Sequence, residues 1–432
     1  MVAAEVFLWG TRIGYVTQED YGSVPVFSYD KNFLTHRMEI SPIVMPLSGR
    51  SYSFPENSKE SFQHLPGLLA DSLPDKFGNR LLDRYFEETG KDISRFSAVE
   101  RLLYIGSRGM GALEYRPAMN LIRDEQSELQ ISSLVEVASD ILTERKKINL
   151  IENEKLMEQI MAIGTSAGGA RAKAVIAWNP ETKSVRSGQI TAGEGYQYWL
   201  IKFDGVKNNK DKETDPDHSG YTRVEYAYYK MAIDSGIEMK ECILCEEADR
   251  FHFMTKRFDR TDDGKKIHMQ SLGALAHYDY NIPGVNSYEQ AANIVYRLGM
   301  GQNEVEQLYR RMIFNCLAKN YDDHVKNISF LMDKDGKWSL APAYDVTYAY
   351  KKDSIWLSRH QMSIGGKLDN ISQDDIICVG RTMNIKDERS KQILEQIYEI
   401  TKKWISYAEE SNVPEAYADR IQKEIRRIWI SS

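Results

Sequence analysis

The chain has few cysteines and no long apolar run, and each shortage excludes a class of protein. Four cysteines in 432 residues are too few for the disulfide framework of a small secreted domain. Cys242 and Cys245 form a lone Cys-x-x-Cys without a second pair at metal-ligand spacing, so we expect both to be structural. No apolar run is long enough to cross a bilayer, and residues 1–5 lack the pattern of a signal peptide. The sequence therefore predicts a cytoplasmic protein.

An excess of positive charge is also absent. The chain has 56 Lys and Arg residues against 63 Asp and Glu residues, which gives a formal net charge of −7. Binding to nucleic acid depends mainly on cationic contacts with phosphates, so we expect DNA to be reached only through a partner. The hydrophobic fraction of 42% is ordinary for a globular protein, and the length predicts two or three domains.

What the chain does contain is a polar run, residues 320–327, placed between predicted elements of regular structure. Apolar residues recur at helical spacing from Val305 to Leu317, which predicts a helix that ends before this run. Residues 328–331 and 338–340 then have the composition of a β-hairpin. Because a hairpin reverses the chain, we expect Asp345 to return to the side of the polar run.

The polar run holds the residue types that phosphoryl transfer requires, namely a carboxylate base, a cation for the phosphates and oxygen ligands for Mg²⁺. Asp322 precedes Asn327 by five residues, the spacing of the base and the metal-binding Asn in protein-kinase catalytic loops. We interpret Asp322 as the base and Lys326 as the cation on the transferred phosphate. Asn327 and Asp345 are the candidate Mg²⁺ ligands. The alternative for any such isolated motif is a polar surface loop.

A second candidate is the glycine-rich stretch 164–173, which precedes a predicted strand at 174–178. Such loops can present backbone N–H groups to phosphate oxygens. The stretch is not a Walker A loop, because Ala170 and Arg171 stand where Lys and Ser or Thr are required. A simple turn before the strand is the alternative. The candidate nucleotide contacts are Ser166, Gly168, Gly169 and Lys173.

Lys202 interrupts the apolar strand pattern of residues 198–203, and such a lysine normally needs an anion or a phosphate as its partner. A lysine on an edge strand that extends its charged end to water is the alternative. Glu225, on the next predicted helix, is one candidate, and a solvated position on the helix surface is its alternative. After a predicted strand at 251–255, residues 256–260 fall where a kinase hinge would meet adenine. The remaining candidate cofactor contacts are Phe258 and His324.

The first 120 residues predict a set of strands and short helices. Residues 6–16 have the pattern of a hairpin, and Ser72 to Asp75 mark the start of a helix. Residues 97–100 have the spacing of a capping box. The glycine cluster 106–111 could hold an anion, although the end of a helix is the simpler interpretation.

Taken together and in order, these motifs resemble those of the HipA-family serine/threonine kinases, the toxins of HipA–HipB type II toxin–antitoxin modules. The resemblance covers almost the whole chain, because residues 6–14 and 73–75 also look like the N-terminal subdomain of that family. The motifs are Ser166-x-Gly-Gly-Ala-Arg-x-Lys173, Ile201-Lys-Phe203, Arg257-Phe-Asp-Arg260, Asp322-x-His-x-Lys-Asn327 and Tyr344-Asp345.

The resemblance implies an α+β, two-lobed protein-kinase-like fold with a β-rich N-terminal region and an all-α C-terminal lobe. It divides the chain into three parts. Residues 1–120 would form the N-terminal HipA subdomain, 121–255 an N-lobe-like region with the Gly-rich loop, and 256–432 the all-α lobe with the catalytic loop.

The resemblance also implies a function that depends on ATP and Mg²⁺. Asp322 would be the base, Asn327 and Asp345 would hold Mg²⁺, and Lys202 would bind the ATP phosphates. Asp323 stands at a position that is often Gly in the family's motif and is expected to add negative charge near the metal. Ser166 matches the serine that these kinases autophosphorylate, which silences them. The substrate would be a cellular protein, an aminoacyl-tRNA synthetase in the best-known member.

The implied partner is a small helix-turn-helix DNA-binding antitoxin. We expect it to dock on residues 1–120, because the phosphoryl-transfer residues lie outside that region. Two alternatives stay open, a catalytically idle co-repressor scaffold and a small-molecule phosphotransferase. The first would be marked by loss of Asp322, Asn327 or Asp345, and all three are present.

Overall fold

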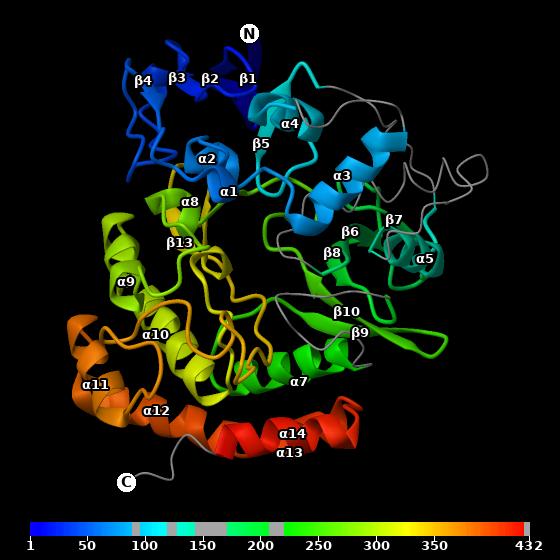
Figure 1. Ribbon diagram of the computed structural model, residues 1–432, viewed down its shortest axis with the longest axis vertical. Coiled ribbons are helices and arrows are strands. Elements are labelled where there is room, and N and C mark those ends of the chain that lie inside the picture. The colour runs from blue at the N-terminus through cyan, green and yellow to red at the C-terminus, as the bar shows by residue number, and fades with distance from the viewer. Residues whose placement is uncertain (89–95, 119–127, 143–170, 207–219, 427–432) are drawn as a thin grey trace.

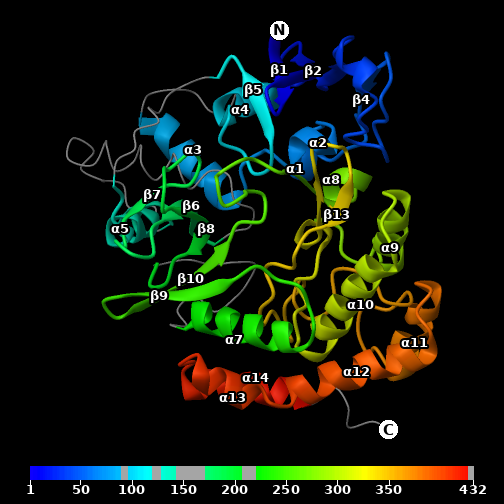
Figure 2. The ribbon, with the colours of Figure 1, turned by 180° about the vertical axis from the view of Figure 1, so that it is seen from behind.

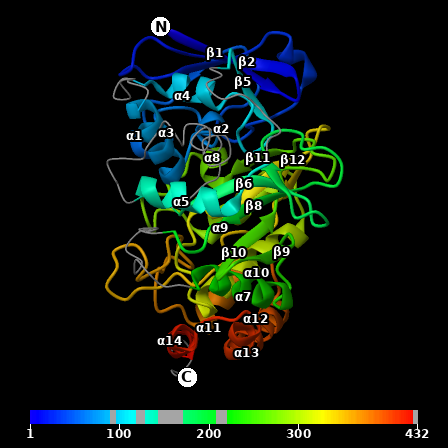
Figure 3. The same ribbon diagram turned by 90° about the vertical axis from the view of Figure 1, so that its right-hand side faces the viewer.

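Three separate antiparallel sheets and the helices around them build an α+β fold (Figure 1). The computed structural model describes residues 1–88, 96–118, 128–142, 171–206 and 220–426. Figure 3 shows the first sheet at one end of the molecule and the helices α11–α14 at the other. No helix in these described ranges is both long enough and apolar enough to span a membrane.

The first sheet has the strand order β4-β3-β2-β1-β5. The predicted hairpin is confirmed, because β1 and β2 pair in antiparallel register around the turn at Gly10. Alternate residues of β1 are buried, as expected of a strand with one face on a core. The strands are β1 Val2–Leu8, β2 Thr11–Gln18, β3 Val26–Tyr29, β4 Ser51–Ser53 and β5 Leu113–Arg116.

Short helices connect this sheet to the rest of the chain. The predicted capping box is present, since Ser97 Oγ accepts from the Glu100 N–H while a Glu100 carboxylate oxygen accepts from the Ser97 N–H. Gly106 ends that helix with a positive φ of 58°, which confirms the helix-end interpretation for this glycine. The helices are α1 Lys59–Phe62, α2 Gly67–Ala70, α3 Lys76–Glu88 and α4 Ala98–Ile105.

The second sheet has the strand order β7-β6-β8-β10-β9 and lies at mid-height on one side of the molecule, between the first sheet and the C-terminal helices (Figures 1 and 2). Residues of α3 and of α5, Ile131–Leu142, form one core with β6 and β8. Helix α7, Tyr221–Asp234, packs on β9 and β10. The strands are β6 Lys173–Trp178, β7 Val185–Ser187, β8 Gln197–Lys202, β9 Cys242–Glu247 and β10 Arg250–Lys256.

The region after residue 256 is mainly helical but contains a third sheet, so the prediction of an all-α C-terminal lobe is wrong. The sheet has the order β11-β12-β13, with β11 His268–Ser271, β12 Ser329–Met332 and β13 Trp338–Leu340. The predicted hairpin supplies two of these strands. The third comes from residues 268–271, where buried polar side chains on β11 concealed the apolar pattern of a strand.

One apolar core joins the first sheet to the C-terminal helices. Helix α10, Gln302–Leu317, lies within it and leads into the polar run, as predicted. The other helices of this part are α8 Leu272–Ala276, α9 Tyr288–Arg297, α11 Gln373–Thr382, α12 Asp387–Thr401, α13 Trp404–Glu410 and α14 Glu415–Arg426. All four cysteines are free, in agreement with the expected absence of a disulfide framework.

Candidate functional site

Lys202 at the end of β8 lies between two carboxylates that come from distant parts of the chain. Its ammonium group contacts Glu225 on α7 and Asp345, which follows the third sheet. Glu225 is buried, and the Lys202 side chain is only 11% exposed. The expected pairing of Lys202 with Glu225 is therefore confirmed, and the surface alternative for Glu225 is wrong.

A second lysine lies beside Lys202 on the neighbouring strand. Lys173 on β6 is the register partner of Lys202 on β8, so two like charges face each other on neighbouring strands. Such a pair is destabilising unless anions compensate it. Lys173 is 3% exposed and forms an ion pair with Asp75 at 3.7 Å. Two cations are thus held together by three carboxylates, those of Asp75, Glu225 and Asp345.

The electrostatics of this cluster favour an ionised Asp345. Burial alone would raise the pKa of the Asp345 carboxyl, but Lys202 and Lys173 outweigh it and hold this pKa below its usual range. Burial raises the pKa of Glu225, and Lys202 opposes that shift. The backbone of Asp345 has φ of 53°, in the left-handed region that non-glycine residues rarely adopt. Asp345 is therefore charged and has an uncommon backbone conformation. Its negative charge suits a ligand for a cation.

Asp75 belongs to the N-terminal region, which was expected to lie outside the phosphoryl-transfer residues, yet its carboxylate pairs with Lys173 of the candidate site. Its Oδ1 accepts from the N–H of Gly78 at 2.6 Å in the first turn of α3. Burial raises the pKa of Asp75 to about 7, and Lys173 and Lys326 work against this rise. The sequence pattern around residues 72–75 correctly predicted a helix start but gave no sign of this role.

The polar run folds back on itself. Asn327, at the end of the short 3-10 helix Val325–Asn327, donates from Nδ2 to the backbone carbonyl of Asp322 at 2.8 Å. The amide nitrogen is used in this bond, so the Oδ1 of Asn327 is left to face other groups as an acceptor. This bond closes the loop between Asp322 and Asn327, which are five residues apart.

Asp323, which lines the same cavity as Asn327 and Asp345, is held in a buried network. Its carboxylate accepts from His360 Nδ1 at 2.7 Å, from the Gln361 N–H at 2.7 Å and from the Tyr288 hydroxyl at 2.9 Å. Burial alone would lower the pKa of His360, but Asp323 outweighs it and raises this pKa to about 10. A protonated histidine therefore compensates the negative charge that Asp323 is expected to add near the metal.

Lys326 and His324 share an aromatic neighbour. The ammonium of Lys326 lies 4.8 Å from the ring centre of Tyr280, and the ring of His324 lies 5.6 Å from the same ring. The carbonyl of Lys326 accepts from the hydroxyl of Tyr344 at 2.5 Å. Because Tyr344 precedes Asp345, this bond ties the polar run to the second carboxylate.

The predicted hinge segment is fixed by a buried ion pair. Arg257 donates from Nε and Nη2 to both oxygens of Asp259 at 2.8 and 2.6 Å, and the N–H of Gly111 donates to Asp259 Oδ2 at 2.8 Å. The glycine cluster 106–111 was considered as an anion site, and the anion that Gly111 contacts there is the carboxylate of Asp259. Phe258, between these two residues, packs its ring 5.5 Å from that of Tyr344.

A small cavity of about 30 Å³ opens beside the polar run. His324, Asn327 and Asp345 line it together, and amide and carboxylate oxygens are ligands that Mg²⁺ accepts. Within the described residues no group of three or more His, Cys, Asp or Glu side chains could hold a metal by itself. Mg²⁺ is usually held by one or two carboxylates plus substrate phosphates, so a site with few carboxylates fits that ion.

The structure therefore brings most of the predicted site residues together. Ser166, Gly168 and Gly169 lie outside the described residues. Sequence reasoning missed Asp75 and His360, because each pairs with a charged residue far away in the sequence. The predicted residues that meet in this region are Lys173, Lys202, Phe258, Asp322, His324, Lys326, Asn327 and Asp345.

Comparisons with known proteins show what the chain is similar to. A Haemophilus influenzae protein named "Putative kinase" is 30% identical over 161 residues, 33% of this chain and 46% of that protein. The match thus spans less than half of that relative. The solved complex of Shewanella oneidensis MR-1 HipA, HipB and operator DNA contains a chain with a TM-score of 0.69 and 16% identity. The alignment covers 98% of this chain and 95% of that one, and at this identity it shows a shared fold.

Two families match the sequence directly. The HipA N-terminal domain matches residues 4–116, and the HipA-like C-terminal domain matches residues 165–405. The second match alone spans more than half of the chain. By these matches the chain belongs to the HipA family.

Proposed function

We propose that this protein is an ATP- and Mg²⁺-dependent serine/threonine protein kinase and the toxin of a HipA–HipB type toxin–antitoxin module. The observation that carries the proposal is the meeting of Lys202, Glu225 and Asp345. A lysine on a strand, a glutamate on the following helix and a metal-binding aspartate are the parts that protein kinases align for phosphoryl transfer. The relative named as a kinase and the membership of the HipA family support the same assignment.

Each side chain has a role in this scheme. Lys202 and Lys173 would contact the ATP phosphates, while Asn327 and Asp345 would hold Mg²⁺. The metal, when bound, neutralises charge on the phosphates. Asp322 accepts the proton of the substrate hydroxyl as its oxygen bonds to the γ-phosphorus. The bond from that phosphorus to the bridging oxygen breaks and ADP leaves. Lys326 stabilises the charge on the transferred group.

The further parts of the proposal concern the proteins on which the enzyme acts. We propose Ser166 as its own phosphorylation site, since a phosphate there would add about −1.5 to −2 charges within a loop for ATP phosphates and weaken nucleotide binding. The external substrate is a cellular protein, with an aminoacyl-tRNA synthetase as one candidate. A HipB-like helix-turn-helix antitoxin is the proposed partner, because the similar Shewanella chain was solved with HipB and operator DNA.

The test is phosphate incorporation measured by intact mass. Dephosphorylated protein is incubated with ATP and Mg²⁺, with ATP and chelator, or with Mg²⁺ alone. We expect one added phosphate only in the first sample, and peptide mapping should place it on Ser166. Protein that neither gains phosphate nor shows a Mg²⁺-dependent rise in melting temperature with ATP would contradict the kinase assignment and favour an idle scaffold.

A small-molecule phosphotransferase would behave differently. It would show Mg²⁺-dependent stabilisation by ATP but transfer phosphate to neither Ser166 nor any protein in a lysate. Phosphate on lysate proteins, absent when Asp322 is replaced by Asn, would exclude that alternative.

A further inference from the structure

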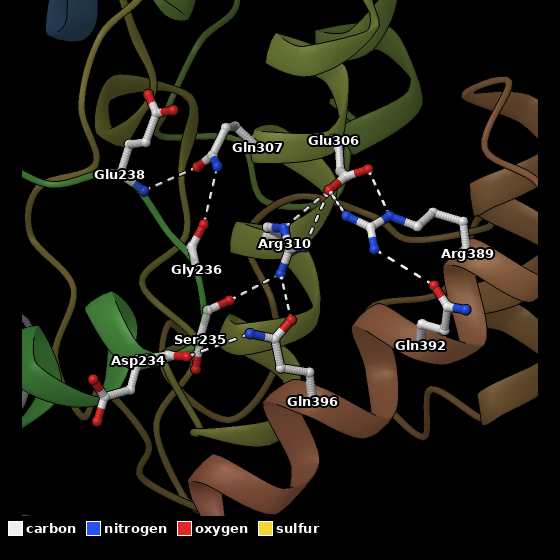
Figure 4. Close-up of polar contacts among 10 residues, drawn as sticks. All are labelled: Asp234, Ser235, Gly236, Glu238, Glu306, Gln307, Arg310, Arg389, Gln392 and Gln396. Atoms are coloured by element: carbon white, nitrogen blue, oxygen red, sulfur yellow. Dashed lines mark hydrogen bonds and ion pairs between the residues drawn. The ribbon is translucent and has the colours of Figure 1, made fainter.

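Helix α7, which carries Glu225, is anchored at its C-terminal end by side chains of α10 (Figure 4). Arg310 donates from Nη1 to the backbone carbonyl of Ser235, directly after the helix, at 3.0 Å. The same nitrogen donates to Gln396 Oε1 on α12 at 3.0 Å. A cation at this end of a helix is favourable, because the last carbonyl groups there lack helical partners and carry partial negative charge.

The guanidinium of Arg310 is buried and is shared among three helices. Its Nε and Nη2 donate to Glu306 Oε1, one turn earlier on α10, at 3.2 and 3.0 Å. Glu306 also accepts from Arg389 on α12 at 2.6 and 2.9 Å. Arg310 is 7% exposed, whereas the Arg389 side chain is 46% exposed. Both arginines therefore bind the same carboxylate, that of Glu306, but Arg310 also contacts the end of α7.

The segment that follows α7 is held from two sides. Gln307 of α10 donates to the carbonyl of Gly236 at 2.9 Å and accepts from the Glu238 N–H at 2.9 Å (Figure 4). On the other side, the N–H of Ala343 donates to the carbonyl of Glu238 at 2.8 Å. Ala343 lies two residues before Asp345. The segment after α7 is thus tied both to α10 and to the segment after β13, which carries Asp345 to Lys202.

Asp234, the last residue of α7, also accepts from the Tyr407 hydroxyl of α13 and from Gln396 Nε2 of α12, the latter at 3.4 Å. The remaining contacts of α7 are exposed or lie further along the helix. Lys230 pairs with Glu410 of α13 at an exposed position, where ion pairs contribute about 0–1 kcal/mol. Tyr228 donates its hydroxyl proton to the carbonyl of Ala318 at 2.5 Å, near the middle of the helix. Glu225 lies about 15 Å along the helix from Ser235, at 1.5 Å per residue. A tilt of a few degrees about the anchored end would therefore move the glutamate by about 1 Å.

We propose that Arg310 is a positioning residue, which holds α7 so that Glu225 meets Lys202 before any nucleotide binds. Helix α10 also leads into the polar run with Asp322 and Asn327. One helix thus fixes both the base and the glutamate that orients the lysine. The consequence for catalysis rests on the proposed kinase function, whereas the positional claim concerns the nucleotide-free protein.

Hydrogen–deuterium exchange of the nucleotide-free full chain tests the positional claim. In the Arg310→Ala variant we expect the amides of residues 226–235 to exchange at least about tenfold faster than in the wild type. Arg389→Ala is the matched control, because it also breaks an arginine bond to Glu306 but leaves the end of α7 untouched. Arg310→Lys should restore part of the protection, since lysine keeps one donor and the charge but loses the planar fork. Equal exchange of α7 in the two alanine variants would overturn the proposal.

Turnover separates positioning from general destabilisation. Misplacement by about 1 Å can cost about 100-fold in rate, so Arg310→Ala should lower kcat of Mg²⁺-ATP-dependent phosphate transfer by about 10- to 100-fold at a temperature where it stays folded. Arg389→Ala should keep kcat within about twofold even if its melting temperature falls equally, and parallel losses of kcat in both would contradict the proposal. If the wild type itself transfers no phosphate, the kinase assignment fails, and the exchange experiment still decides the position of α7.

Discussion

His360 donates a hydrogen bond from Nδ1 to the carboxylate of Asp323 at 2.7 Å, and both side chains are only 1% exposed. The pair joins the polar run to a segment 37 residues later, beside the candidate base Asp322. Breaking a buried ion pair by removing one partner costs about 3–5 kcal/mol, because the other charge is left uncompensated. This relationship predicts how the stability of the protein depends on pH.

The pKa of His360 is raised to about 10 in the folded protein, above the ordinary value of 6.5 that applies when unfolded. The folded state therefore binds a proton that the unfolded state releases above about pH 6.5. The stabilisation is full below that pH and is lost as the pH rises toward 10. We expect the free energy of unfolding of His360→Gln to fall furthest below that of the wild type at pH 6, with the gap narrowing toward pH 10.

Denaturant unfolding at pH 6, 8 and 10 measures this gap. His36→Gln is the control, since His36 is exposed and pairs with no carboxylate among the described residues. A gap for His360→Gln that stays constant across this range would mean that the histidine is neutral in the folded state.

The two candidate catalytic aspartates should fail in different ways. Asp322→Asn removes the proton acceptor but leaves the lysines, so transfer should fall by about 10²- to 10⁴-fold while ATP still raises the melting temperature. Asp345→Asn should lose transfer and also weaken the Mg²⁺ dependence of that rise. Asp335→Asn, in the exposed hairpin turn, is the control. Wild-type transfer in both active-site variants would show that the residues are misassigned.

The N-terminal region should influence nucleotide affinity through Asp75. Without this carboxylate, Lys173 is left to pair with Asp345. Lys173 would then compete with the metal for the Asp345 carboxylate. We expect Asp75→Asn to weaken Mg²⁺-ATP binding by about tenfold, measured as the ATP concentration needed for half of the maximal thermal shift. Asp83→Asn, at a half-buried position further along α3, should leave that concentration unchanged. Identical values for the two variants would argue that Asp75 has a purely structural role.

Tight DNA binding should require a second protein. With a net charge of −7, the isolated chain is expected to shift no operator fragment at physiological salt, whereas the chain with a basic helix-turn-helix antitoxin should do so. A gel-shift titration of each component and of the co-purified complex measures this difference. Sequence-specific binding by the isolated chain would refute the charge argument, and failure of any such protein to co-purify would refute the proposed partner.

Local patterns in the sequence predicted the pieces of the fold that depend on neighbouring residues. An apolar run predicted β8, helical spacing predicted α10, and the spacing of Ser97 and Glu100 predicted a capping box that the structure confirms. Lys202 was recognised because a lysine within an apolar strand needs a partner. These features follow from interactions over a few residues, which a single sequence displays directly.

The charged pairs of the site were decided by the tertiary structure. The sequence itself determined that Lys202 needs an anion and that Asp322 and Asn327 form one loop. It could not determine that Asp75 would meet Lys173 or that His360 would neutralise Asp323. These partners are separated by 98 and 37 residues, and their charges look like ordinary surface residues until the fold removes water from both. The third sheet has the same origin, because β11 becomes a strand by pairing with β12, some 60 residues away.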